Sequence, residues 1–472
     1  MSYSATTIVW LRRDFRLSDN AALTAAAARG AVIPVFILDP QVGALGAAPQ
    51  MRLDQALSAF QETLKSLGMR LILRRGQAEQ VLPKLVQETG ADAVFWNRRY
   101  DAPSVACDTN LKADLGTRGV KAKSFAGTLL FEPWTVATGQ GGPYRVYTPF
   151  WKAVRDRVVS QPLARPSLVA PSAWPQSETS ADWDLSRRMQ GGARVVAQYM
   201  QAGEDAAMNK LTTFIDERVA AYRDKRDFMG SAATSELSDA LSLGEISPAQ
   251  CWHAGWRAKE SGAPGAEHFL KELTWREFAW HLMWHFPSLD TQTWRPEWAR
   301  FSWIENPEDV NYLRWCQGRT GVTLVDAAMR ELYVTGKMHN RARMIAASYL
   351  TKHLGVHWRL GRRWFEECLI DWDAASNAMG WQWVAGCGPD ASPYFRIFNP
   401  DTQAAKFDPD EAYRKRWLAE PYNVPSSTAL EFFAAAPNHW NLKPDAPYGP
   451  PIVGLKEGRQ QALSAYETFK LQ

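Results

Sequence analysis

Short β-rich runs alternate with helical patterns over residues 6–130, and this alternation constrains the fold more than any other feature of the sequence. The expected strands are residues 7–11, 32–38, 70–73 and 93–96, with a further extended run near residues 121–130. Apolar residues recur at helical spacing from Leu53 to Leu67, and Gly68 ends that pattern. Strands that alternate with helices in this way predict a doubly wound parallel sheet with helices on both faces.

The rest of the chain has a different pattern. Residues 161–180 are rich in Pro and Ser, which predicts a connector. Beyond them helical periods continue to the end, including a short helix near residues 457–471. Because 472 residues exceed the size of most single cores, we expect separate domains. These are an α/β domain over residues 1–135, an interdomain connector over 136–200 and a larger all-α domain over 201–472.

Several classes of protein are disfavoured by what the sequence lacks. No G-x-G-x-x-G follows the first expected strand and no G-x-x-x-x-G-K-[ST] occurs, which argues against a nicotinamide or nucleoside triphosphate site in the first domain. The five cysteines are scattered without metal-ligand spacing, so we expect a reducing, cytoplasmic environment and no metal. The start lacks the pattern of a signal peptide, and the apolar run at residues 31–38 is short. We expect a monomer that does not enter a membrane.

Positive charge is concentrated in one segment. The net charge is only +4, yet residues 330–363 carry one acidic residue, Glu331, and eight basic ones: Arg330, Lys337, Arg341, Arg343, Lys352, Arg359, Arg362 and Arg363. A solvated helical face is the simpler interpretation of such a run. Aromatic residues nearby favour a patch that follows a phosphate backbone.

Three ordered signatures mark the second domain. They are Glu-Leu-Thr-Trp-Arg-Glu-Phe at 272–278, Met-His-Asn-Arg-Ala-Arg-Met at 338–344, and Asp-Trp-Asp-Ala-Ala-Ser-Asn-Ala-Met-Gly-Trp-Gln-Trp at 371–383. Any single one of the 22 tryptophans can be simple core packing. As a set, however, these rings lie beside charged and amide groups that are seldom buried unless they are paired or bound. A polar, ring-shaped ligand would satisfy both kinds of residue.

A cluster of small hydroxyl residues precedes another helical stretch. It reads Thr234-Ser235-Glu236-Leu237-Ser238 and follows Tyr222. Such residues cap helix N-termini, where free N–H groups bind anions. Ordinary capping without a ligand is the alternative.

These signatures resemble those of the DNA photolyase and cryptochrome family, in particular its bacterial cyclobutane pyrimidine dimer (CPD) photolyases. Residues 9–20, Val-Trp-Leu-Arg-Arg-Asp-Phe-Arg-Leu-Ser-Asp-Asn, are similar to the family's opening strand and turn, so the resemblance covers nearly the whole chain. It implies an α/β antenna-binding domain followed by an all-α catalytic domain that binds FAD and DNA. The implied reaction is light-driven: excited, reduced FAD passes an electron to the dimer in UV-damaged DNA, the cyclobutane bonds open and the electron returns.

The resemblance also assigns the flavin site. Arg343 pairs with Asp371 beside the isoalloxazine, and Asn377 faces the flavin N5. The family usually has Arg or Lys where Glu236 stands and often Pro where Asp239 stands, so phosphate contacts from these two positions are not expected. The implied cofactor-binding residues are Tyr222, Thr234, Ser235, Leu237, Ser238, Arg276, Arg343, Asp371, Asp373 and Asn377.

A dimer must leave the duplex to be reached, as photolyases and other base-modifying enzymes require. Trp275 and Trp383 resemble the walls of the lesion pocket, and Glu272 resembles the carboxyl that hydrogen-bonds the dimer and steadies its radical anion. The implied lesion-binding residues are Glu272, Trp275, Asn340, Arg341, Met344 and Trp383. Related (6-4) photolyases carry two functional histidines in this region. Here Asn340 follows His339 and position 344 is Met, which favours cyclobutane dimers.

Trp381, Trp358 and Trp303 match the family's electron-transfer triad, and Trp372 offers a side branch or simply fills space. The stretch at residues 96–104 lacks the Asn-Glu pair of enteric folate-binding members. We favour methenyltetrahydrofolate as the antenna chromophore over a deazaflavin. The alternatives to CPD repair are cryptochrome-type blue-light signalling, (6-4) repair and plain electron transfer. The intact lesion residues, the lack of a long disordered tail and the basic segment favour repair.

Overall fold

The computed structural model describes residues 5–391 and 393–471. Its N-terminal region contains a five-stranded sheet in the order β3-β2-β1-β4-β5, in which every neighbouring pair is parallel. The strands are β1 (Ala5–Leu11), β2 (Gly30–Leu38), β3 (Ile72–Arg75), β4 (Ala93–Asn97) and β5 (Lys121–Phe125). The predicted doubly wound parallel sheet is confirmed.

Two strands differ from the expected ranges. β3 begins later than predicted, because its pairing with β2 starts at Ile72, opposite Val35. Leu71 is buried but precedes the strand. β5 is shorter than the predicted run, because beyond Phe125 the chain leaves the sheet and contacts the helical region. There the backbone N–H of Leu130 donates to Glu277 over 2.7 Å.

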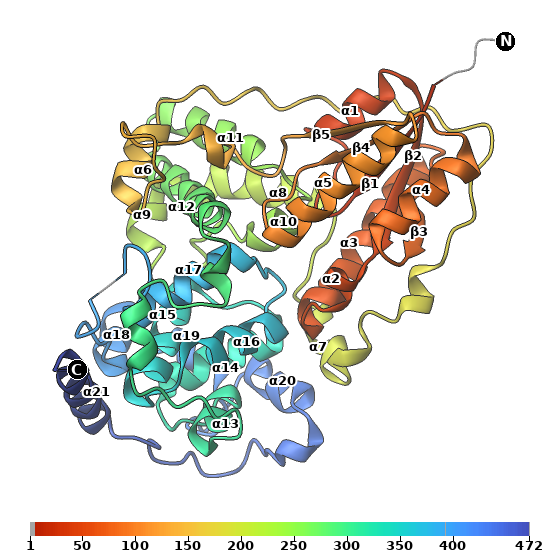
Figure 1. The fold of residues 1–472 in the computed structure, drawn as a ribbon. Coiled ribbons are helices and arrows are strands. Elements are labelled where there is room, and N and C mark those ends of the chain that lie inside the picture. The colour runs from red at the N-terminus through yellow and green to blue at the C-terminus, as the bar shows by residue number, and fades with distance from the viewer. Residues whose placement is uncertain (1–4, 392, 472) are drawn as a thin grey trace.

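Helices cover both faces of this sheet (Figure 1). Alternate β1 residues point to opposite sides, so Val9 joins the apolar core with α1 (Ala21–Ala27) and α3 (Ala47–Ser66). Trp10 joins the core on the other face with α4 (Ala78–Thr89) and α5 (Ala102–Thr117). The short α2 (Pro40–Gly43) precedes α3, which ends before Gly68 as predicted.

The remainder is mostly helical, as predicted, and forms two apolar cores. In Figure 1 the green helices lie beside the sheet and the blue helices lie below them. The α-helices after the sheet are α6 (Tyr147–Val154), α7 (Gly192–Ala197), α8 (Glu204–Thr213), α9 (Tyr222–Lys225), α10 (Ser238–Leu243), α11 (Pro248–Glu260), α12 (Ala266–His285), α13 (Val310–Cys316), α14 (Thr323–Thr335), α15 (Asn340–Ser348), α16 (Trp358–Cys368), α17 (Ala374–Ala385), α18 (Pro400–Phe407), α19 (Ala412–Trp417), α20 (Ser427–Ala435) and α21 (Leu455–Lys470).

The segment between the two regions packs against both. Tyr147 and Phe150 of α6 belong to the same apolar core as α12. Trp174, in the Pro-rich stretch, packs against both faces of the sheet domain. The domain boundaries at residues 135 and 200 stay predictions.

The sheet domain meets the helical region at a close backbone approach. Gly244 has a φ of +65°, and a Cβ there would collide with the carbonyl of Arg13. Arg16 donates from Nη1 to the Gly244 carbonyl over 2.9 Å. Only glycine satisfies both the left-handed backbone and this approach. Among residues 5–391 and 393–471, no helix has the length and apolar character that a membrane crossing requires.

Candidate functional site

A cavity of about 220 Å³ lies among the helices that carry the sequence signatures. One face of α12 contributes four of its residues at helical spacing, Phe269, Glu272, Leu273 and Arg276. Ten of the predicted residues line this cavity: Tyr222, Ser235, Leu237, Ser238, Glu272, Arg276, Arg343, Asp371, Asp373 and Asn377. Sequence reasoning missed Phe269 and Leu273, which the periodicity around Glu272 could have revealed, and also Leu241, Ser242 and Ser376.

Arg343 and Asp371 form an ion pair at the cavity. The Arg343 Nη2 donates to Asp371 Oδ2 over 2.7 Å, and its Nε donates to the Met338 carbonyl over 2.8 Å. Asp371 is buried, yet its Oδ1 has no hydrogen-bond partner among the described residues. A buried acceptor of this kind is costly unless a bound group donates to it. Asp371 therefore suits a ligand that presents an N–H group.

Asp373 and Asn377 begin the helix that forms another wall. Asp373 caps α17, since its Oδ1 accepts the Ser376 N–H over 2.8 Å, and its Oδ2 accepts the Trp280 indole N–H over 3.0 Å. Asp373 therefore both caps α17 and lines the cavity. Asn377 donates one amide N–H to the Asp373 carbonyl over 3.1 Å. Its amide keeps a second N–H and an oxygen lone pair for a ligand.

The small-hydroxyl segment lies at one end of the cavity. Ser235, Leu237 and Ser238 line it, whereas Thr234 is half-buried and does not. Glu236 adopts a φ of +54° and is exposed. Its carboxylate lies 4.0 Å from Arg218. Glu236 lines a neighbouring solvent-open cavity and not this one, which is consistent with the expectation that it makes no phosphate contact.

The predicted lesion residues fall into two sets. Glu272 lines the cavity and forms an ion pair with Arg226. Trp275, Asn340, Arg341, Met344 and Trp383 lie outside the cavity lining. Trp275 stacks on Tyr147 of α6, with ring centroids 3.6 Å apart and an interplanar angle of 7°. Tyr147 was missed because it comes from a segment far from Trp275 in sequence.

Asn340 and Met344 share one turn of α15 beside a cationic contact. The Asn340 Nδ2 lies 4.0 Å from the Met344 Sδ. Arg341 donates to Asp227 over 2.6 Å, and its guanidinium lies 4.6 Å from the centroid of the Phe407 ring. Asn340 is exposed, so it remains accessible to a partner.

The three predicted electron-transfer tryptophans lie close to α16. Trp381 packs on Gly361, where any Cβ would collide with its ring, and Trp358 begins the same helix. The imidazole of His357 lies 5.5 Å from the ring of Trp358 and 5.5 Å from that of Trp303. His357 was not predicted. A backbone bridge between Ile304 and Val356 fixes Trp303 beside it.

The interpretation of residues 330–363 as one phosphate-following patch is wrong. Arg330 is buried and forms a bidentate pair with Glu420 at 2.5 and 2.8 Å. Lys352 is buried and donates to the Tyr394 carbonyl over 2.7 Å, and burial lowers its pKa to about 7. Arg343 faces Asp371, and only Arg363 of the eight is exposed. The prediction treated the eight charges as one patch because they are close in sequence. Helix packing instead directs their side chains to different sides of the domain.

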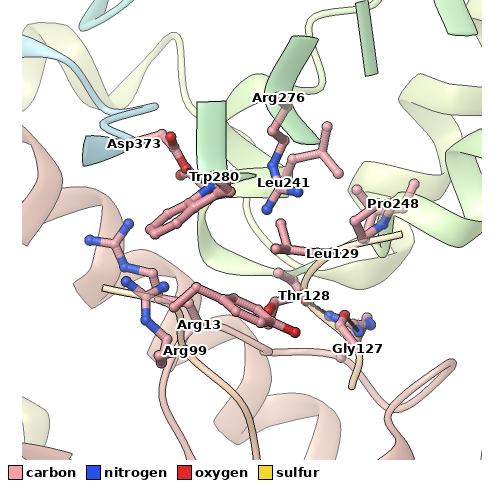
Figure 2. A pocket seen from close by; sticks show the side chains of 15 residues that line it. Arg13, Arg99, Gly127, Thr128, Leu129, Leu241, Pro248, Arg276, Trp280 and Asp373 are labelled. Carbon is pink, nitrogen blue, oxygen red and sulfur yellow. Dashed lines mark hydrogen bonds between the residues drawn. The ribbon is translucent and has the colours of Figure 1, made fainter. Parts of the chain in front are cut away.

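A smaller cavity of about 20 Å³ lies where the sheet domain meets the helical region, with room for about one water. Figure 2 shows Arg13 and Arg99 on one side of it and Trp280, Asp373 and Arg276 above. Arg13 donates to the Trp372 carbonyl over 3.2 Å. Burial, reinforced by the charge of Arg99, lowers the pKa of Arg13 to about 10. Arg276 and Asp373 line both this cavity and the larger one, so the two cavities are adjacent.

The described residues contain no cluster of three or more His, Cys, Asp or Glu side chains placed to hold a metal ion. A parallel α/β domain is followed by a helical domain with a polar cavity, an arrangement that suits a two-domain protein with a polar ligand among its helices. The family description "DNA photolyase" matches residues 7–167, and "FAD binding domain of DNA photolyase" matches residues 269–468. The chain belongs to the DNA photolyase family.

Individual relatives agree along nearly the full length. A deoxyribodipyrimidine photo-lyase of Agrobacterium fabrum is 44% identical over 99% of this chain and 98% of the relative. Cryptochrome-1 of Arabidopsis thaliana is 33% identical over 97% of this chain and 70% of the relative. The crystal structure of a class III photolyase from Agrobacterium tumefaciens superimposes with a TM-score of 0.92 at 42% identity, covering 100% of this chain and 99% of that one.

Proposed function

We propose that this protein is a deoxyribodipyrimidine photo-lyase that repairs cyclobutane pyrimidine dimers in UV-damaged DNA. The observation that carries the proposal is that Glu272, the implied lesion-binding carboxylate, lines the same cavity as Arg343, Asp371 and Asn377. A flavin and a flipped-out dimer would therefore meet at one half-open cavity. When bound, reduced FAD supplies the electron that light transfers to the dimer and later takes it back.

The cavity residues fit a flavin nucleotide. The unpartnered Asp371 Oδ1 can accept an N–H of the isoalloxazine, while Arg343 keeps that carboxylate in place. Asn377 offers both a donor and an acceptor without adding charge. Ser235 and Ser238, at the other end, offer hydroxyl groups to the phosphates. We assign the remaining predicted contacts, Tyr222, Thr234, Leu237, Arg276 and Asp373, to the same cofactor.

Glu272 would orient the lesion and stabilise its transient negative charge. The ion pair with Arg226 fixes the carboxylate, and the guanidinium lies 5.2 Å from the Tyr222 ring centroid. Arg226 thus adds positive charge at the place where electron density accumulates on the dimer. Arg226 was not predicted from the sequence.

We propose that DNA lies over α15 and its neighbours. Trp275, held flat by Tyr147, and Trp383 would stack on the flipped bases, and Asn340 and Met344 would contact their edges. Exposed cations near Arg341 would neutralise phosphates. Lys406 and Lys225 lie over Phe407 and Phe228, two rings in mutual contact beside Arg341.

Trp381, Trp358 and Trp303 would conduct electrons when the flavin needs reduction. The contacts of Trp381 with Gly361 and of His357 with both other rings support a continuous route. Trp372 is buried beside Arg362, whose guanidinium lies 5.4 Å from its ring. Space filling accounts for Trp372, so we leave it out of the route.

We further propose an antenna chromophore on the α/β domain, with methenyltetrahydrofolate favoured over a deazaflavin. Arg99, within the relevant stretch, lies at the junction with the helical region, close to Trp280. The excitation energy of a chromophore bound there would have a short path to the flavin cavity. Absorption spectra of the released chromophore distinguish the two candidates. We also propose that the protein works as a cytoplasmic monomer.

The test is repair itself. Reduced, FAD-loaded protein is mixed with UV-irradiated oligothymidylate, and thymine absorbance is followed under blue light and in the dark. Light-dependent recovery supports CPD repair. No recovery, although flavin and damaged DNA are both bound, would favour (6-4) repair or signalling, which the (6-4) photoproduct and a partner screen then separate.

A further inference from the structure

A buried carboxylate gathers three cations next to the small-hydroxyl segment. Asp239 is fully buried, directly after Ser238. The Lys210 Nζ lies 3.5 Å from each of its oxygens, the Lys337 Nζ lies 3.9 Å from Oδ2, and the Arg52 Nε lies 3.5 Å from Oδ2. Burial alone would raise the pKa of Asp239, but Lys337, Lys210 and Arg52 together hold that pKa below its usual value.

These groups carry more positive than negative charge. Arg52 is neutralised by Glu245, to which it donates from both Nη atoms. Glu236, the other acidic group near Lys210, is half-exposed and faces Arg218 at 4.0 Å. Asp239 is thus left to balance both lysines, which gives a surplus of one positive charge in a largely buried place.

The two ammonium groups are also weakly held. Their contacts with Asp239 are 3.5 Å or longer, whereas a charged N–H···O bond is normally about 2.7–2.9 Å. Burial lowers the pKa of Lys210, and the charge of Lys337 lowers it further. Two lysines that repel each other at long distance from their shared carboxylate retain N–H donors for another anion.

The position of Lys210 indicates which anion this is. Lys210 and Ser235 both line a solvent-open cavity of about 620 Å³. Ser235 also lines the flavin cavity, so the two cavities adjoin at Ser235, and Lys210 lies on the outer side of that junction with Glu236 and Arg218. Glu236 cannot serve there, because its charge has the wrong sign for a phosphate.

We infer that Lys210 and Lys337, positioned by Asp239, form the cationic wall of the subsite for the flavin diphosphate. The inference rests on the proposed function, since it requires FAD in the cavity. Asp239 itself is a positioning residue that aims the two ammonium groups. The lysines supply the positive charge that position 236 lacks in this chain.

A purely structural role is the simpler explanation, because the same contacts join α3, α8 and α10 with residue 337. The two roles predict different results. A structural cluster would lower the stability of the apoprotein when it is disrupted. A diphosphate subsite would lower affinity for FAD while leaving apoprotein stability nearly unchanged.

The experiment measures FAD binding to apoprotein by flavin fluorescence, with inorganic pyrophosphate as a competitor. Lys210→Met and Lys337→Met keep the apolar stems and remove the charge. Each is expected to weaken FAD binding about tenfold, as for loss of a charged hydrogen bond, and the double variant more. Pyrophosphate should compete with FAD on the wild-type protein and no longer on the double variant. Lys470→Met, which removes an exposed cation 5.0 Å from the Tyr466 ring centroid on α21, is the matched control and should bind FAD normally.

Asp239→Asn provides a second test of the inference. It keeps both lysines but removes their anchor, and we expect weaker FAD binding with pyrophosphate competition reduced. Unfolding midpoints of all apoproteins identify any variant that loses FAD through misfolding. Wild-type FAD affinity in the folded double variant would overturn the inference while leaving the proposed function intact. A wild-type apoprotein that binds no FAD would contradict the proposed function instead.

Discussion

Two buried polar clusters, one around Asn97 in the sheet domain and one around Asp371 and Asp239 in the helical domain, differ in how their polar atoms are satisfied. In the sheet domain Asn97 donates to Asp14 over 2.7 Å and to Asn20 over 2.8 Å, and Arg16 donates to backbone carbonyls on both sides. In the helical domain Asp371 leaves one buried oxygen without a partner in the described chain, and Lys210 makes only long contacts. The first network is satisfied within the chain, whereas the second leaves polar atoms that a ligand could satisfy.

This difference separates residues that stabilise the fold from residues that bind. A satisfied buried network rigidifies its domain, and removing a member leaves the others unpaired. An unsatisfied buried group lowers the stability of the protein without its ligand, and binding of the ligand restores that stability. Charged side chains of both domains meet at the arginine-lined junction of Figure 2, where Arg276 and Asp373 belong to the ligand cavity.

The largest contrast comes from matched substitutions in the two networks. Asp371→Asn removes the charge that pairs with Arg343 and that we propose contacts the flavin, so we expect FAD affinity to fall by more than about tenfold. Asn97→Ala leaves Asp14 without one of its donors and should lower the free energy of unfolding by about 1–3 kcal/mol, with FAD affinity unchanged. Equilibrium unfolding and FAD titration of both variants check this. Equal loss of FAD in the two would contradict the contrast.

A second prediction concerns the tryptophans of the helical domain. Trp358→Phe should reduce photoreduction of oxidised FAD to a small fraction of the wild-type rate, because the middle ring of the proposed electron route becomes harder to oxidise. Repair by enzyme reduced chemically beforehand should keep its wild-type rate. Flash photolysis and the repair assay measure the two quantities separately. Equal loss of both would refute the assignment of Trp358 to the electron route.

A third, smaller effect is expected at the lesion wall. Trp275→Ala should weaken binding of dimer-containing DNA by roughly 1–3 kcal/mol, the usual value of one stacked base. Binding of undamaged DNA should change little. Trp256→Ala, which removes a half-buried ring of α11, is the control. If both variants bind damaged DNA like the wild type, Trp275 is only a packing residue against Tyr147.

The smallest expected effect is a pH dependence confined to the helical domain. All eight histidines follow residue 250, and burial lowers the pKa of four of them to about 4, namely His281, His339, His353 and His357. Between pH 6.5 and 4 these histidines therefore bind more protons in the unfolded chain than in the folded one. The histidines alone should lower the stability as the pH falls through this window, whereas Glu277 and Glu331, whose pKa values burial raises to about 7, act in the opposite direction. Relative to the wild type, His339→Gln should remove up to one proton of the histidine contribution to the slope. An unchanged slope in His339→Gln would contradict the lowered pKa of His339.

The sequence predicted what is local and missed what depends on distant segments. The parallel sheet, α3 and α21 follow from sequence patterns, and the family resemblance implied ten residues that line the cavity. Tyr147 and Arg226 come from elsewhere in the chain, so no motif indicated their contacts. Arg330 was misassigned because its partner Glu420 is remote in sequence.

The central claim is that the helical domain is built around a flavin nucleotide and that the sheet domain is not. Amide hydrogen exchange of the apoprotein with and without FAD tests it directly. We expect FAD to slow exchange in α10, α12, α15 and the start of α17, with little change in β1, β2 and β4. Equal protection of both domains, or protection of the sheet domain alone, would contradict the account.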